Sequence, residues 1–304
     1  MIDILQLAPL RPEIQQQLEQ RYRVHPRDAL ESVADRIRGI VTNGARGPAA
    51  DIIDKLPKLE IIACGSVGYD SIAVEHARAK GIAVTNTPEV LNDDVADLAI
   101  ALMIMTARQL VASDRHVREG KWLKGEYPLA RRASGKRVGL LGMGRIGRAI
   151  ARRAEAMNNS IVYHSRRPVP DVPWRHCPDL VAMAREVDFL IAILPATPQT
   201  QKIVSRAVLE ALGPDGIFVN VARGAVVDEA ALVELLQDGK LGGAGLDVFA
   251  QEPKVPEALF PMNNVVLQPH VGSATVETRR AMSQLVLDNL DAHFAGKPLL
   301  TPVV

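Results

Sequence analysis

Short apolar runs alternate with helical patterns through the first hundred residues. Four runs rich in β-branched residues predict strands, and Ser71–Ala79 predicts one of the helices between them. The predicted strands are Ile2–Leu5, Ile37–Thr42, Ile61–Cys64 and Ala83–Thr85. Because strands that alternate with helices build βαβ units, this part of the chain is expected to form a parallel sheet.

A second series with the same alternation follows a long apolar helix predicted over Asn92–Leu110. Its predicted strands are Arg137–Leu141, Ile161–His164, Phe189–Leu194, Ile217–Asn220, Ala244–Leu246 and Val265–Leu267. A last helix, about Thr275–Phe294, has a helical stripe of apolar residues that would pack on the first domain. We therefore predict an α/β protein with two doubly wound parallel-sheet (Rossmann-like) domains. The first is discontinuous, with residues 1–98 plus 285–304, and the second comprises residues 99–284.

Composition narrows the classes of partner. The 304 residues carry 36 basic and 35 acidic side chains and only 4% aromatic residues. This balance argues against nucleic acid and anionic membranes as partners. The apolar run Leu98–Met105 is shorter than the roughly 18–20 residues of a membrane span. The two cysteines, Cys64 and Cys177, give neither a disulfide framework nor metal-ligand spacing, so we expect no metal site and a cytoplasmic location.

A glycine-rich turn connects the first strand of the second series to a helix. The residues expected to contact a dinucleotide there are Gly142, Met143, Gly144, Arg145, Ile146 and Gly147. Gly142 permits a tight turn, Gly144 permits the close approach of a pyrophosphate, and Gly147 permits helix–strand packing. A purely structural tight turn is the alternative. We therefore expect residues 99–284 to bind a dinucleotide. The first domain is predicted to be a flavodoxin-like, substrate-binding domain.

The end of the next strand indicates which dinucleotide is preferred. An NAD site usually has an acidic residue about twenty positions after the glycines, which accepts hydrogen bonds from the ribose. Here the strand is followed by Ser165, Arg166 and Arg167, and no carboxylate occurs before Asp171. Two guanidinium groups suit a ribose 2′-phosphate, so NADP(H) is predicted in preference to NAD(H). The alternative is a pair of solvated charges.

Three loops at successive strand ends carry candidate catalytic residues. Arg223, Glu252 and His270 follow the last three predicted strands, and ligands bind at the carboxyl ends of strands in doubly wound sheets. Arg223 is a fixed cation for a carboxylate or developing alkoxide, His270 is a proton donor, and Glu252 would stabilise its imidazolium. Each of the three also has a structural alternative, as a helix-entry charge, a loop salt bridge or a packed histidine.

Two further segments bear on substrate binding. The small-residue turn Ser66, Val67 and Gly68 follows a strand, and its backbone N–H groups would suit a substrate carboxylate, although a plain strand-to-helix turn is the alternative. Trp122, Leu123 and Tyr127 lie on a polar arm before residue 137. They would either line the cleft of a partner subunit or pack in a core or interface.

These residues resemble the D-isomer-specific 2-hydroxyacid dehydrogenase family along essentially the whole chain. The resemblance is carried by segments 66–70, 139–147, 221–229, 242–249, the pair Glu252–Pro253, and 269–275. It implies catalytic roles for Arg223, Glu252 and His270, and binding of substrate by Ser66, Val67 and Gly68 together with Arg223 and His270. It also places Pro195, Val221 and Asp247 among the cofactor contacts.

The resemblance further implies an active-site cleft between the two domains, a homodimer and D stereochemistry. The Ser165–Arg167 tip and the C-terminal residues 276–304 are most similar to NADPH-dependent glyoxylate, hydroxypyruvate and hydroxyphenylpyruvate reductases. The expected reaction is hydride transfer from NADPH to a small 2-keto acid. The alternative is a nucleotide-sensing, non-enzymatic binding protein of the corepressor type.

Overall fold

The computed structural model describes all 304 residues and divides the chain into two compact units. Unit 1 comprises Met1–Leu91 and Ser273–Val304, and unit 2 comprises Asn92–Gly272. The first unit is therefore discontinuous. The boundaries differ from residues 98/99 and 284/285 because the helices Asn92–Ala107 and Val276–Phe294 are each continuous and each belongs wholly to one unit.

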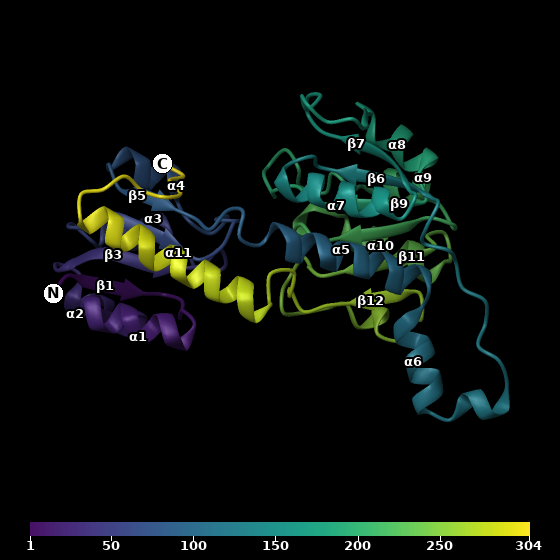
Figure 1. Cartoon of the computed structure of the whole chain (residues 1–304), viewed down its shortest axis with the longest axis horizontal. Helices are drawn as coiled ribbons and strands as arrows, with labels where there is room; N and C mark the ends of the chain where they lie inside the picture. The colour runs from purple at the N-terminus through teal and green to yellow at the C-terminus, as the bar shows by residue number, and fades with distance from the viewer. The chain divides into compact units, whose positions relative to one another are not determined.

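Unit 1 contains a five-stranded parallel sheet with the strand order β2-β1-β3-β4-β5. The strands are β1 (Asp3–Gln6), β2 (Arg23–Pro26), β3 (Ile37–Thr42), β4 (Ile61–Cys64) and β5 (Ala83–Thr85). The helices are α1 (Pro12–Arg21), α2 (Leu30–Val33), α3 (Ala50–Asp54), α4 (Val74–Ala79) and α11 (Val276–Phe294). Helices α1 and α11 cover one face of the sheet, and Figure 1 shows α11 lying along it.

The two faces of this sheet bury separate clusters of apolar side chains. Ile4, Val41 and Ile61 pack against Val286 and Leu290 of α11. On the opposite face, side chains such as Leu5, Ile40 and Ile62 pack against α2, α3 and α4. Burial on both faces explains the uninterrupted apolar strands, as is usual for parallel sheets.

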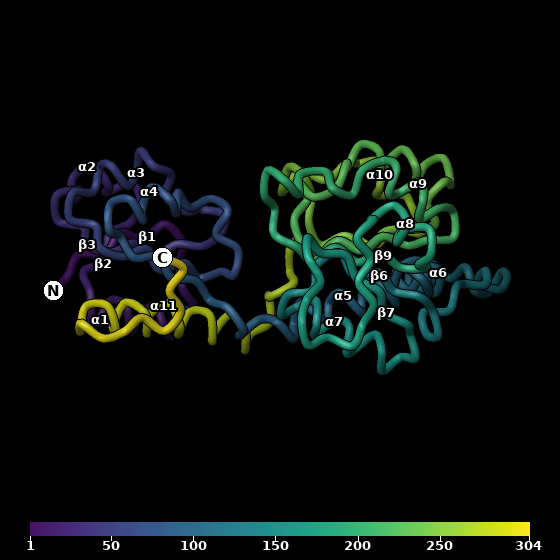
Figure 2. The backbone as a smooth tube through the Cα atoms, turned by 90° about the horizontal axis from the view of Figure 1, so that it is seen from above, coloured from purple at the N-terminus to yellow at the C-terminus, as the bar shows by residue number.

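Unit 2 contains a seven-stranded parallel sheet with the order β12-β11-β10-β9-β6-β7-β8. The strands are β6 (Arg137–Leu141), β7 (Ser160–His164), β8 (Arg175–His176), β9 (Phe189–Ala192), β10 (Ile217–Asn220), β11 (Gly243–Leu246) and β12 (Val265–Leu267). The helices are α5 (Asn92–Ala107), α6 (Leu110–Arg118), α7 (Arg145–Ala156), α8 (Leu180–Glu186), α9 (Arg206–Leu212) and α10 (Glu229–Gln237). Figure 2 shows α8, α9 and α10 on one face and α5 and α7 on the other.

The predicted helix Asn92–Leu110 is in fact two helices. Gln109 has a φ of 50° between α5 and α6, and this left-handed backbone ends the first helix. No single helix is long and apolar enough to span a membrane, although α5 and α6 pass that test together despite a bend of 61°. An arm follows α6 and extends from unit 2 (Figure 1).

Candidate active site

The glycine-rich turn lies where the strand order of unit 2 reverses, between β6 and β9. Gly142 has a φ of 111°, and a Cβ there would lie 2.4 Å from the Ile193 carbonyl oxygen. A Cβ on Gly147 would lie 2.4 Å from the Gly142 carbonyl oxygen, whereas one on Gly144 would meet nothing within 4 Å. The first and third glycines are thus needed by the fold itself. The second leaves open space at the N-terminus of α7, where a pyrophosphate would bind.

The loop after β7 brings the predicted phosphate-binding residues to one surface. A cavity of about 550 Å³ is lined by Ser165, Arg166 and Arg167. Arg166 and Arg167 are both exposed, and the Ser165 hydroxyl donates to the Arg167 carbonyl oxygen at 2.6 Å. The charge and position of this cavity fit the adenosine end of a dinucleotide that carries a 2′-phosphate.

Asn220 fixes the loop after β10, a role that was not predicted from the sequence. Asn220 is fully buried, accepts from the Ala222 N–H at 3.0 Å and donates to the Arg223 carbonyl oxygen at 3.0 Å. A buried amide at a strand end was the signal available in the sequence. The Arg223 Nη1 donates to the Ala222 carbonyl oxygen at 2.7 Å, so the half-buried guanidinium lies against its own loop.

Gly224 explains how the Arg223 loop meets the loop after β11. A Cβ on Gly224 would lie 1.9 Å from the Phe249 carbonyl carbon and 2.3 Å from the Ala250 nitrogen. Only a glycine permits this approach of two backbones. The Ala250 N–H in turn donates to the Glu229 carboxylate at 2.9 Å, which connects the same loop to the start of α10.

Glu252 and His270 form the central pair of the site. His270 Nδ1 lies 2.7 Å from Glu252 Oε2, and the Phe249 N–H donates to Glu252 Oε1 at 3.1 Å. Because a carboxylate accepts, the proton of this pair is on Nδ1, and Nε2 is left for a ligand. The imidazole side chain is 46% exposed, so a small substrate can reach it.

The backbone of His270 is held in an unusual conformation by Asp247. His270 has a φ of 55°, a region that few residues other than glycine adopt. Its N–H donates to the Asp247 carbonyl oxygen at 2.9 Å, while the N–H groups of Val271 and Gly272 donate to the Asp247 carboxylate at 2.7 and 2.9 Å. Burial raises the pKa of Asp247, and the two N–H donors oppose that rise.

The remaining predicted cofactor contacts lie on loops at the same sheet edge. Pro195 follows β9, and its carbonyl oxygen accepts from the Thr200 hydroxyl at 2.8 Å. Val221 is buried, and its N–H donates to the Ala192 carbonyl oxygen at 3.2 Å. Met143 is buried inside the glycine-rich turn, which leaves its backbone rather than its side chain for a ligand.

In unit 1, the carbonyl oxygens of the turn Ser66–Gly68 accept hydrogen bonds from the chain, whereas two of its N–H groups do not donate to it. The Ser66 carbonyl accepts from Thr87 N–H at 3.0 Å, and the Val67 carbonyl accepts from Asn86 Nδ2 at 3.0 Å. The Gly44 N–H donates to the Ser66 hydroxyl at 3.0 Å. The N–H groups of Val67 and Gly68 donate to no group of the chain. A carboxylate would satisfy them.

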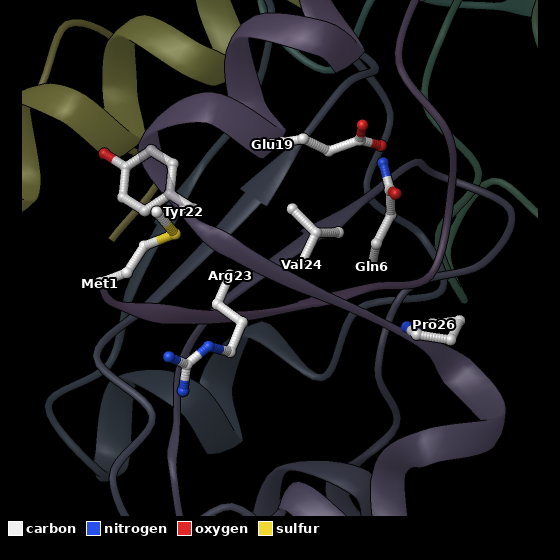
Figure 3. Close-up of a pocket in the computed structure, with 7 residues that line it drawn as sticks. All are labelled: Met1, Gln6, Glu19, Tyr22, Arg23, Val24 and Pro26. Atoms are coloured by element: carbon white, nitrogen blue, oxygen red, sulfur yellow. The ribbon is translucent and has the colours of Figure 1, made fainter.

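A second cavity, of about 480 Å³, lies at the opposite edge of the unit 1 sheet from β5 (Figure 3). Glu19 of α1 and Arg23 and Val24 of β2 line it. Figure 3 shows Met1 and Tyr22 beside these side chains. It contains neither a histidine nor a glycine-rich turn, so the pair Glu252–His270 remains the candidate reaction centre.

Comparison with known proteins agrees with this geometry. Residues 100–272 match the D-isomer specific 2-hydroxyacid dehydrogenase NAD binding domain. The chain is 48% identical over 310 residues to a hydroxyphenylpyruvate reductase of Plectranthus scutellarioides, covering 100% of this chain and 99% of that protein. A glyoxylate/hydroxypyruvate reductase of Arabidopsis thaliana is 49% identical over 310 residues with the same coverage.

A solved structure gives the same result for the fold. The NADPH-dependent glyoxylate/hydroxypyruvate reductase of Sinorhizobium meliloti, in complex with NADP and malonate, superimposes with a TM-score of 0.94 at 46% identity. The match covers 100% of this chain and 97% of that one. The predicted fold class and the predicted family are confirmed. The chain belongs to the D-isomer-specific 2-hydroxyacid dehydrogenase family.

Proposed function

We propose that the protein reduces a small 2-keto acid, such as glyoxylate or hydroxypyruvate, to the D-2-hydroxy acid with NADPH. The observation that carries the proposal is the 2.7 Å contact between His270 Nδ1 and Glu252 Oε2, on an exposed imidazole at the sheet edge. The reductase names of the relatives support it. Those relatives give no support to a non-enzymatic nucleotide sensor.

His270, Glu252 and Arg223 have separate roles in the proposed reaction. When bound, the reduced nicotinamide supplies the hydride. His270, with Nδ1–H on Glu252, donates a proton from Nε2 to the carbonyl oxygen of the substrate, and the carboxylate stabilises the imidazolium before that transfer. Arg223 provides a fixed positive charge for the substrate carboxylate or for the developing charge on the oxygen.

The N–H groups of Val67 and Gly68 are proposed to bind the substrate carboxylate. The carbonyl oxygens of Ser66 and Val67 already accept hydrogen bonds from the chain. The Gly68 carbonyl oxygen is enclosed, since a Cβ on Gly44 would lie 2.3 Å from it. The two adjacent N–H groups then offer donors that no acceptor of the chain occupies.

Preference for NADPH over NADH is proposed from Arg166 and Arg167. The double variant Arg166→Ala, Arg167→Ala should raise the Kd of NADPH at least about a hundredfold and that of NADH less than threefold, since each of the two charge-assisted contacts contributes about 1.5–3 kcal/mol. Titration of the intrinsic nucleotide fluorescence measures both constants. Equal losses for the two cofactors would remove the arginines from phosphate recognition.

A homodimer and a cytoplasmic location complete the proposal. Trp122, Leu123 and Leu129 on the arm are 67%, 94% and 102% exposed, and a second copy of the chain would cover them. Tyr127 instead packs on its own chain, with its hydroxyl 3.0 Å from Gln109 Oε1. Light scattering after size exclusion tests the dimer. The two buried free thiols fit a reducing compartment.

The reaction itself is tested by initial rates of absorbance loss at the nicotinamide band. NADPH and NADH are each combined with glyoxylate, hydroxypyruvate, 2-ketogluconate, pyruvate and hydroxyphenylpyruvate. We expect turnover with NADPH, and for His270→Ala a loss of two to four orders of magnitude in kcat with NADPH binding retained. An inert wild-type protein that still binds NADPH would refute the proposed activity.

A further inference from the structure

The segment that carries Arg166 and Arg167 is pinned at both ends by side chains. At its start, the Ser165 carbonyl oxygen lies 2.9 Å from His176 Nε2. At its end, the Val169 N–H donates to the Tyr163 hydroxyl at 2.9 Å. Neither pin lies among the predicted site residues.

The pins come from two adjacent strands and pack on each other. Tyr163, on β7, is 1% exposed, and its ring centroid lies 5.2 Å from that of His176 on β8. A carbonyl oxygen can only accept, so His176 Nε2 carries the proton in this contact. The phenol thus acts as an acceptor and the imidazole as a donor, and both point at the backbone of one short loop.

From this geometry we propose that His176 and Tyr163 are positioning residues for the ribose 2′-phosphate of NADPH, holding Ser165–Val169 so that Arg166 and Arg167 are presented together. The inference rests on the proposed preference for NADPH. Two long exposed side chains on a loose loop would have to be ordered when the phosphate binds, and a pinned loop removes part of that cost beforehand.

The edge strand does not depend on the His176 side chain for its own attachment. The Cys177 N–H donates to the Tyr163 carbonyl oxygen at 2.8 Å, and His164 Nδ1 donates to the Cys177 carbonyl oxygen at 2.9 Å. A change confined to the imidazole therefore removes the pin at Ser165 and leaves these contacts of the strand. This separates a positioning role from a general structural one.

Three variants test the proposal. His176→Leu removes the donor, His176→Gln keeps an N–H donor on a side chain of similar reach, and Tyr163→Phe removes the acceptor for Val169. The matched control is His76→Leu in unit 1, where the imidazole contacts Asp54 at 2.8 Å. Calorimetric titration gives Kd for NADPH, NADH, adenosine 2′,5′-bisphosphate and 5′-AMP, so the result does not depend on turnover.

We expect His176→Leu to weaken NADPH and the 2′,5′-bisphosphate about tenfold, the usual scale of one hydrogen bond, with NADH and 5′-AMP changed less than twofold. His176→Gln should restore most of the loss, and Tyr163→Phe should weaken the same two ligands. Equal losses for all four ligands, or no loss, would overturn the proposal.

The arginine double variant separates this inference from the proposed cofactor preference. If that variant discriminates between NADPH and NADH while His176→Leu and Tyr163→Phe do not, only the positioning role fails. If the arginine variant weakens NADPH and NADH equally, the proposed preference for NADPH is wrong, and the positioning role that rests on it falls with it. Should His176→Leu not fold, His176→Gln and Tyr163→Phe still decide the matter through the ratio of bisphosphate to 5′-AMP affinity.

Discussion

Gly224→Ala should nearly abolish turnover while it leaves nucleotide binding intact. The added methyl group would lie 1.9 Å from the Phe249 carbonyl carbon and 2.1 Å from its oxygen, although real Cβ contacts are essentially never shorter than 3.0 Å. The two loops must therefore separate by about 1 Å. Both obstructing atoms are backbone, so no side-chain rotation relieves the clash.

The magnitude follows from what each loop carries. Arg223 precedes the substituted residue, and the opposing loop runs from Phe249 to Glu252, which contacts His270. A displacement of about 1 Å in a catalytic group costs on the order of a hundredfold in rate. Overpacking of this kind also costs about 1–3 kcal/mol of stability. For a unit of this size that is a decrease in Tm of several degrees, at about 2–4 °C per kcal/mol.

The assay compares kcat, the Kd of NADPH and the Tm of Gly224→Ala with those of Gly125→Ala. Gly125 is a suitable control because a Cβ there meets nothing within 4 Å. The variant should keep a Kd for NADPH within about threefold of wild type, since the glycine-rich turn and the Ser165–Arg167 tip lie on other loops. Wild-type kcat in Gly224→Ala would refute the reasoning that the contact of these two backbones positions Arg223, Glu252 and His270.

Three other predictions test separate features. Glu252→Gln should lower kcat at least tenfold with an unchanged Kd for NADPH, because the imidazolium loses its countercharge; an unchanged kcat would contradict that role. Native Cys64, whose pKa burial raises to about 12, should resist iodoacetamide at pH 8 and react in urea, as mass spectrometry would show. The hydrogen bond from Arg38 holds the pKa of Glu60 below its usual value, so its stabilisation is present above the unfolded pKa and is lost as pH falls through the folded one. Glu60→Gln should thus lose at most about 1 kcal/mol at pH 7, because this pair is partly exposed, and progressively less in urea titrations as the pH falls through the folded pKa.

The apolar strands could be predicted closely because burial on both faces leaves a continuous signal. Ile37–Thr42, Ile61–Cys64 and Ile217–Asn220 have the bounds expected from the sequence. The edge strands β2 and β8 were not predicted, because Arg23–Pro26 and Arg175–His176 are short, contain no apolar run and include no buried residue. Their conformation is set by pairing with β1 and β7 rather than by their own composition.

The break between α5 and α6 was also beyond the sequence pattern. The apolar residues continue to Leu110 and Val111, and nothing in local propensity distinguishes Gln109 from its neighbours. Its left-handed backbone is supported by tertiary contacts, among them the hydrogen bond from the Tyr127 hydroxyl to its side chain at 3.0 Å. Such long-range support is not visible in a local window of sequence.

At the candidate site, the residue types were predictable but the contacts that hold them were not. Placement at strand ends was enough to select Glu252 and His270, and the structure joins them at 2.7 Å. Asn220 bonds only to the nearby Ala222 and Arg223, but a loop conformation is needed to bring these groups to its amide. Gly224 contacts Phe249, which is far away in the sequence, so only the folded chain shows why a glycine stands there.

The backbone and the side chains of the site have different roles, which explains why residue types were easier to predict than contacts. The glycine-rich turn, the Val67–Gly68 turn and the strained His270 loop all present backbone N–H groups or fixed backbone directions, which small residues and buried acceptors such as Asp247 hold in place. The side chains that we propose to discriminate between NADPH and NADH, Arg166 and Arg167, lie instead on an exposed loop, where packing cannot hold them. Their precision must come from hydrogen bonds to the loop backbone, and His176 and Tyr163 are the residues that supply those bonds.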